Sequence, residues 1–292
     1  TGCGMMDCKK ALTESNGDFE KAVEYLREKG LAAAAKKAGR IAAEGMVFAE
    51  ADMAKKVGVV IEVNAETDFV AKNELFRTFV QDLAQIVINE NPADVDALLK
   101  CKMGDGDVDA ALKEKILVIG ENIKIRRFER FEGVCAAYVH GGGTHGVLVE
   151  FNTSDAVASK PEFVAFGKDI AMQIAAVNPA YLNEASVPAE VLEKEKEILL
   201  AQISNDPKLA SKPDQVKEKM VEGKIGKYYK ENCLVDQQFV KDGDLTVAQY
   251  VEKTGKELGG DIEIVKYVRF EKGEGLEKKE DDFAAEVASM VK

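Results

Sequence analysis

A seven-residue segment that occurs twice constrains the fold of this chain more than any other feature. Residues 58–64 read GVVIEVN, and residues 146–152 read GVLVEFN. Each copy is followed by a helical pattern of apolar residues, and similar strands with cationic insertions, at 123–128 and 264–270, end the two regions. Such self-similarity is typical of a duplicated structural unit. The sequence therefore predicts two α+β units, each ordered as strand, corner, helix and strand.

The two copies differ at the corner that follows the repeated strand. The first continues as AETDFV, whereas the second continues as TSDA and has no aromatic residue there. An aromatic side chain at a surface corner either folds back onto the core or takes part in binding. Because the second copy turns without an aromatic side chain, the repeat favours a functional role for Phe69 over a role in the core.

Charge and composition argue against several function classes. The 40 Lys and Arg residues against 52 Asp and Glu residues give a net charge of −12, which disfavours direct binding to nucleic acid. Arg126 and Arg127 alternate with acidic residues, which favours a solvated strand face. No apolar run approaches the roughly 20 residues of a membrane span, and we see no secretory leader. We therefore expect a cytoplasmic protein.

The residue types that carry chemistry are sparse. Five cysteines match no zinc or redox spacing, and there are only two histidines, so we expect no metal and no cofactor. We find no nucleophile elbow or cofactor fingerprint. The glycine-rich segment 138–146 leads into a strand, which favours a hairpin turn over a phosphate loop. A hydrolase using Glu66, Asp68 and His140 is the weakest alternative, and we expect a binding protein rather than an enzyme.

The pattern of helices, strands and turns predicts five regions. They are a helical module at 1–40, a first core subdomain at 41–136, a second at 137–178 and 230–272, an inserted helical hairpin at 179–229, and a C-terminal helix within 273–292. The first module reads as three helices, with Phe19 on the apolar face of the second and Gly30 at its end. The hairpin consists of two charged amphipathic helices, either a spacer or a binding arm.

Two motifs carry a resemblance to a known family. Residues 4–12 read GMMDCKKAL, and residues 62–72 read EVNAETDFVAK. Both resemble signatures of the translation elongation factor Ts family, the guanine-nucleotide exchange factors of the elongation GTPase Tu, and they occur in the same order. Ala65 departs from the family, in which cysteine or serine is usual, but the segment 67–70 is intact. The resemblance extends over essentially the whole chain.

The resemblance implies a fold, a partner and an activity. It implies a ubiquitin-associated-like three-helix module, duplicated core subdomains with antiparallel sheets, a coiled-coil arm and a C-terminal module that grips the partner. That partner would be elongation factor Tu, and GDP would be released because its magnesium and nucleotide site is disrupted. The resemblance leaves open whether this chain and Tu assemble as a dimer of heterodimers. The competing class is an adaptor or chaperone-like scaffold without exchange activity.

The resemblance also implies partner-binding residues. Phe69 would insert near the magnesium site of the GTPase, and Asp68 would hold the corner through hydrogen bonds. The other implied contact residues lie beside the corner, on the first module and on the tail: Thr67, Val70, Ile119, Gly120, His140, Met5, Met6, Lys9 and Met290.

Overall fold

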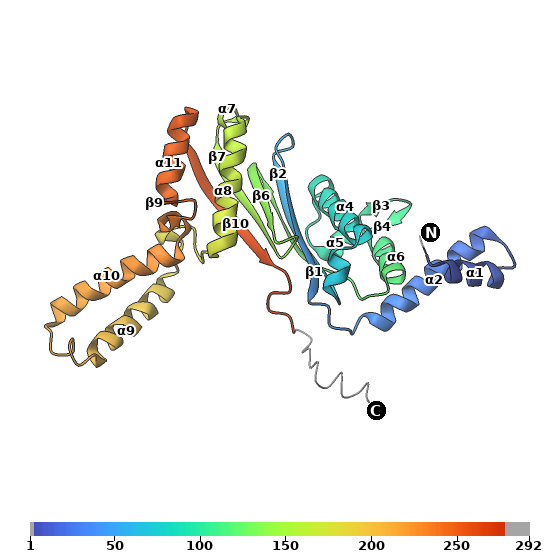
Figure 1. Ribbon diagram of the computed structural model, residues 1–292, viewed down its shortest axis with the longest axis horizontal. Coiled ribbons are helices and arrows are strands. Elements are labelled where there is room, and N and C mark those ends of the chain that lie inside the picture. The colour runs from blue at the N-terminus through green and yellow to red at the C-terminus, as the bar shows by residue number, and fades with distance from the viewer. Residues whose placement is uncertain (1–2, 278–292) are drawn as a thin grey trace. The chain divides into compact units, whose positions relative to one another are not determined.

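The computed structural model describes residues 3–277, which divide into two compact units. Of the described residues, the first unit holds 3–131, 139–146 and 270–277, and the second holds 132–138 and 147–269. Both units combine helices with antiparallel strands (Figure 1), which confirms the predicted α+β class. None of the helices in the described range has the length and apolar character that a bilayer span requires.

Two helices form the N-terminal part of the first unit, α1 (Met5–Glu14) and α2 (Phe19–Lys37). Asn16 and Gly17 turn the chain between them with positive φ angles of 51° and 81°. Asp18 then caps α2 with its carboxylate, which satisfies a backbone N–H that has no partner inside the helix. The two helices pack through small and apolar side chains, namely Ala11, Ala22 and Leu26.

Helix α2 corrects two predictions for this module. Gly30 does not end the helix, so residues 3–40 contain two helices in the structure and not three. Gly30 is buried, and a Cβ there would lie 3.6 Å from the backbone oxygen of Lys113 in α6 (Val108–Ile119). The glycine thus marks a close approach of two helices. Phe19 was also misplaced, because it lies in the first turn of α2 and is 74% exposed.

The sheet of the first unit contains β1 (Glu44–Asp52), β2 (Val57–Ala65) and β5 (Lys124–Glu132) in the order β1-β2-β5. The central strand β2 is buried along its whole length. Helix α4 (Glu74–Glu90) is capped by Asn73, whose side chain accepts a hydrogen bond from the Leu75 N–H. Its apolar face supplies much of the core, through Phe76, Phe79, Val80, Leu83 and Val87.

The second unit repeats the first, element by element. Its sheet contains β6 (Val134–His140), β7 (His145–Thr153) and β10 (Ile262–Glu271), again in sequence order. The short corner helices α3 (Asp68–Ala71) and α7 (Asp155–Ala158), the 17-residue helices α4 and α8 (Pro161–Val177), and the 12-residue helices α6 and α11 (Val247–Leu258) correspond. The predicted order of strand, corner, helix and strand is therefore present in both units.

Smaller elements occupy the connections. In the first unit these are α5 (Val95–Leu98), β3 (Lys102–Met103) and β4 (Gly106–Asp107), and in the second β8 (Gln238–Phe239), β9 (Asp242–Thr246) and the 3₁₀ turns at Glu184–Ser186 and Leu234–Asp236. The strands β3 and β4 pair antiparallel ahead of α6, and β8 and β9 pair ahead of α11. Each unit thus has a small hairpin at the same place in the order of its elements, which extends the correspondence between the units.

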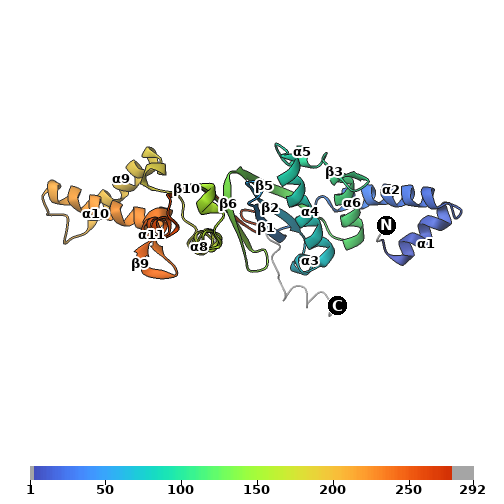
Figure 2. The same ribbon diagram turned by 90° about the horizontal axis from the view of Figure 1, so that it is seen from above.

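Two helices of the second unit form the segment that was predicted as an inserted hairpin. Helices α9 (Ala189–Asn205) and α10 (Asp214–Asn232) lie side by side and run in opposite directions (Figures 1 and 2). They share a small buried cluster of apolar side chains, Leu199, Ile203, Val221 and Ile225. The antiparallel helix pair is thus present, and its coiled-coil character stays a prediction. The predicted C-terminal helix, which includes Met290, lies outside the described residues.

Candidate functional site

The corner after β2 exposes a large aromatic side chain. Phe69 lies in the short helix α3 (Figure 2), and 77% of it is accessible to solvent. Its neighbour Val70 is only 6% exposed and packs in the core of the first unit. The possibility that Phe69 covers the core is therefore excluded. Because the Val70 side chain is packed in the core, it anchors the corner and is not available to contact a partner in this conformation.

Asp68 is exposed beside the ring. Its carboxylate lies 3.0 Å from Lys72 Nζ, and the same ammonium group lies 5.7 Å from the centroid of the Phe69 ring. The hydrogen bond from Lys72 lowers the pKa of Asp68, so this carboxylate carries a negative charge at neutral pH. An exposed ion pair of this type contributes little to stability, which leaves both groups available to a partner.

Two other carboxylates hold the corner in place. Glu121 accepts hydrogen bonds from the Thr67 backbone N–H at 3.0 Å and from the Thr67 hydroxyl at 2.6 Å. Glu66 accepts one from the Asn122 backbone N–H at 2.6 Å. These bonds place Ile119 and Gly120, at the end of α6, next to the segment that carries Phe69. The structure thus brings together five of the predicted residues, Thr67, Asp68, Phe69, Ile119 and Gly120.

His140 lies at the turn between β6 and β7, which is the hairpin predicted for the glycine-rich segment. Gly143 at this turn accepts a hydrogen bond from the Val47 backbone N–H at 2.8 Å. In the sheet Val47 pairs with Glu62, three residues before the end of β2 and hence roughly 10 Å along the strand from the corner. His140 is exposed, and its ring lies 6.2 Å from that of His145. The turn therefore lies at the same end of the sheet as Phe69.

The N-terminal residues that were predicted to contact a partner lie on a different element from the corner, helix α1. Met5 and Met6 are 84% and 73% exposed in the first turn of α1, and Lys9 is exposed one turn later. Unbranched, polarisable methionine side chains adapt well to a docking partner. This exposed surface belongs to the helical module and is separate from the corner.

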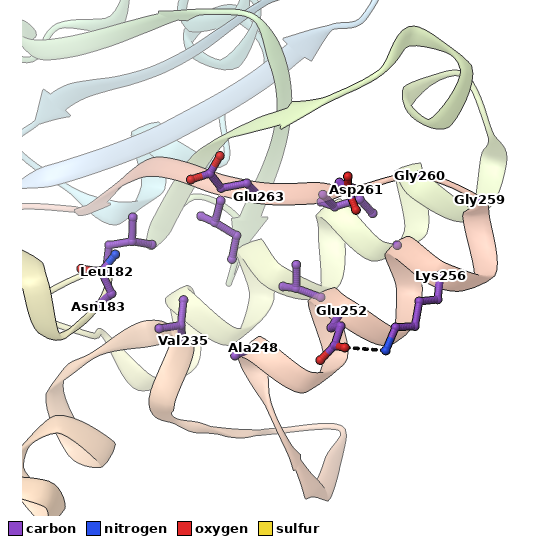
Figure 3. Close-up of a pocket in the computed structure, with 14 residues that line it drawn as sticks. Leu182, Asn183, Val235, Ala248, Glu252, Lys256, Gly259, Gly260, Asp261 and Glu263 are labelled. Atoms are coloured by element: carbon purple, nitrogen blue, oxygen red, sulfur yellow. Dashed lines mark hydrogen bonds and ion pairs between the residues drawn. The ribbon is translucent and has the colours of Figure 1, made fainter.

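A groove in the second unit has a different character. It lies between α11 and β10 and has a volume of about 620 Å³ (Figure 3). Glu252 and Lys256 form an ion pair on its helix side, and Asp261 and Glu263 line its strand side. No histidine, cysteine, serine or threonine is among its lining residues, so it does not pair a hydroxyl or thiol nucleophile with an imidazole base. Across residues 3–277 the structure also contains no cluster of three or more side chains suited to a metal ion.

Comparison with known proteins gives a consistent result. A family model described as Elongation factor TS matches residues 66–274. Relatives named Elongation factor Ts include that of Clostridium perfringens (strain ATCC 13124), which is 54% identical over 99% of this chain and 95% of its own length. Those of Clostridium novyi (strain NT) and Syntrophotalea carbinolica are 52% and 50% identical over 100% of this chain and 95% of their own lengths. The region matched by the family model includes the Phe69 corner, the sheet of the second unit and the helix pair, and the chain belongs to the elongation factor Ts family.

Proposed function

We propose that this protein is the guanine-nucleotide exchange factor of elongation factor Tu and acts by binding the GDP-loaded GTPase and accelerating GDP release. Membership of the family supports a role in translation elongation. The single observation that carries the exchange mechanism is the 77% exposure of Phe69 on a corner that is anchored on both sides. The short helix of the second corner carries Ala156 where α3 carries Phe69, so a corner of this kind forms without an aromatic side chain.

Exchange needs no covalent chemistry from this chain. If the factor binds the nucleotide-free GTPase more tightly than the loaded form, it must weaken nucleotide binding by the same factor. A coupling of about 4 kcal/mol corresponds to roughly a thousandfold change in affinity, and we expect most of it in the rate of release. Phe69 would enter the partner near its magnesium site, and Asp68 would add a negative charge there.

Separate surfaces would supply the affinity. In this proposal Met5, Met6 and Lys9 of a ubiquitin-associated-like module, His140 at the β6–β7 turn and Met290 in the C-terminal region bind the GTPase at other points. The helix pair α9–α10 would be a coiled-coil arm. Several modest contacts on one chain give high avidity because the second contact forms at high effective concentration.

Release of fluorescent mant-GDP from purified Tu tests the proposal. The wild-type protein should accelerate release, whereas Phe69→Ala should act at least about 30-fold more slowly, because truncating an aromatic anchor costs about 2 kcal/mol or more. Circular dichroism should show an unchanged fold, since the short helix of the second corner carries Ala156 at the corresponding position. Phe19→Ala, which removes a ring of similar exposure from the first module, is the matched control.

The result distinguishes the proposal from its alternative. An adaptor or scaffold would bind Tu without changing the rate of mant-GDP release. A Phe69→Ala variant that accelerates release as well as the wild type does would also contradict the mechanism.

A further inference from the structure

We infer that Glu121 is a positioning residue that fixes the Phe69 corner in the orientation needed for insertion into the partner; the inference rests on the exchange function proposed above. Glu121 binds both the backbone N–H and the hydroxyl of Thr67. Hydrogen bonds to an ionised carboxylate are shorter and stronger than those between neutral groups. Two such bonds to one residue fix both its position and its rotation, and Phe69 follows two residues later.

The role of the Thr67 hydroxyl supports this view. Thr67 is the N-cap residue of α3, a position at which a hydroxyl normally accepts a hydrogen bond from the first turn of the helix. In the described structure the Thr67 side chain makes no such capping bond, and its hydroxyl donates to Glu121 instead. Ser154, the corresponding N-cap residue of α7, does accept the capping bond, from the Val157 N–H at 3.3 Å. At the first corner, the hydroxyl of the N-cap residue therefore binds Glu121, which is distant in the sequence, and does not cap its own helix.

A second carboxylate strengthens the anchor from the other direction. Glu66 accepts a hydrogen bond from the Asn122 N–H and lies 3.2 Å from Arg40 Nη1. The side chain of Asn122, which is 2% exposed, donates to the Arg40 carbonyl at 2.8 Å. Residues 66–67 and 121–122 therefore hold each other's backbone through reciprocal bonds. We call this arrangement the corner clamp.

The duplicated unit provides an internal comparison. Helices α6 and α11 correspond, and both end at a glycine in the left-handed conformation, Gly120 and Gly259. The next residue is Glu121 in the first unit and Gly260 in the second. The corner that carries a phenylalanine therefore has the anchoring carboxylate, and the corner that carries Ala156 has none at that position. This association is expected if the carboxylate serves the aromatic side chain rather than the turn itself.

The test uses kinetics and a reporter in the free protein. Glu121→Ala should lower the maximal rate of mant-GDP release from Tu by about tenfold and leave the half-saturating concentration within twofold, because the docking surfaces on α1 and elsewhere are unchanged. In a Phe69→Ala background the same substitution should have no further effect. Thr67→Val, which removes the hydroxyl alone, should lower the rate partly, and Thr67→Ser, which retains a hydroxyl, should lose less of the rate than Thr67→Val does.

The chain contains no tryptophan, so Phe69→Trp creates a single fluorescent reporter at the corner. Time-resolved anisotropy of this variant in the absence of Tu should show greater ring mobility when Glu121→Ala is added. This readout does not depend on exchange, so the two ideas can fail separately. If Phe69→Ala releases GDP normally, the proposed function fails, and unchanged reporter mobility overturns the positioning role. If the rate losses of Phe69→Ala and Glu121→Ala add in the double variant, the positioning role is also overturned. If Glu121→Ala does not fold, the comparison of Thr67→Val with Thr67→Ser decides the question.

Discussion

Replacing Glu62 by glutamine should destabilise the first unit more than the same change at Glu150, its counterpart in the repeated segment, destabilises the second. Glu62 is fully buried in β2. Its carboxylate lies 3.0 Å from Arg126 Nη1 and 2.7 Å from Arg127 Nε, and it accepts a bond from the Gly273 N–H at 2.8 Å. One anion thus binds three groups from two other segments of the first unit, β5 and the segment after β10.

The expected loss follows from this geometry. Removing one partner of a buried charge pair costs about 3–5 kcal/mol, because the remaining charge is left without compensation. Since the side chains of Arg126 and Arg127 are 23% and 31% exposed, water compensates them in part, and we expect about 3 kcal/mol. Glu150 forms an ion pair at 3.2 Å with Lys266, whose side chain is 53% exposed. The Glu150 side chain is itself 17% exposed, so its replacement by glutamine should cost roughly 1–2 kcal/mol, less than the change at Glu62.

Urea unfolding followed by circular dichroism measures both variants, with each transition fitted separately because two units need not unfold together. Hydrogen exchange at the Gly273 amide adds a local readout, since this N–H should exchange faster once the carboxylate is gone. The reasoning is refuted if Glu62→Gln loses no more stability than Glu150→Gln does. Unchanged protection of Gly273 would refute the bond to the carboxylate.

The pH dependence has a definite sign. Burial alone would raise the pKa of Glu62, but hydrogen bonds from Gly273, Asn64, Arg127 and Arg126 outweigh it and lower the pKa below the ordinary value of 4.5. The stabilisation is therefore complete above pH 4.5 and is lost as the pH falls through the lower pKa of the folded state. The difference in stability between the wild type and Glu62→Gln should shrink as the pH is lowered below 4.5.

Two glycine substitutions should have opposite effects on the melting temperature. Gly30→Ala should raise it, because alanine favours a helix interior by about 1 kcal/mol and the new Cβ would contact Lys113 at an ordinary 3.6 Å; a lower value would show that α2 and α6 cannot accept a methyl group. Gly143→Ala should lower the stability by about 1–3 kcal/mol, because φ is 110° and the Cβ would lie 2.7 Å from Met46 Cβ. Gly142→Ala, at φ 68° with no atom within 4 Å, is its control, and equal losses would contradict the steric argument.

Features that depend on neighbouring residues could be predicted from the sequence. The repeated segment and the helical pattern that follows each copy are local signals, and the structure places β2, β7, α4 and α8 where they indicate. The exposure of Phe69 could also be anticipated, because the second copy of the corner served as a comparison. Its action on a partner stays a prediction.

Features that depend on tertiary contacts could not be predicted in this way. Gly30 looks like a helix end when only its neighbours in the sequence are considered. The structure shows instead that a glycine at this position allows the close approach of α6. The alternation around Arg126 and Arg127 indicated a solvated face, whereas both side chains bind the buried Glu62. Glu121 was missed because its partner Thr67 is 54 residues away. A carboxylate directly after a helix-ending glycine, where the second copy has Gly260, was the available signal.

The duplication also affects how freely each corner can change. Ala156 is the second residue of α7, as Phe69 is of α3, and Gly260 follows the glycine after α11, as Glu121 follows the glycine after α6, yet the second unit folds without either large side chain. The two units therefore tolerate different side chains at these positions, and one copy can specialise without changes in the other. A chain built in this way can evolve a new contact at one corner while its twin preserves the architecture.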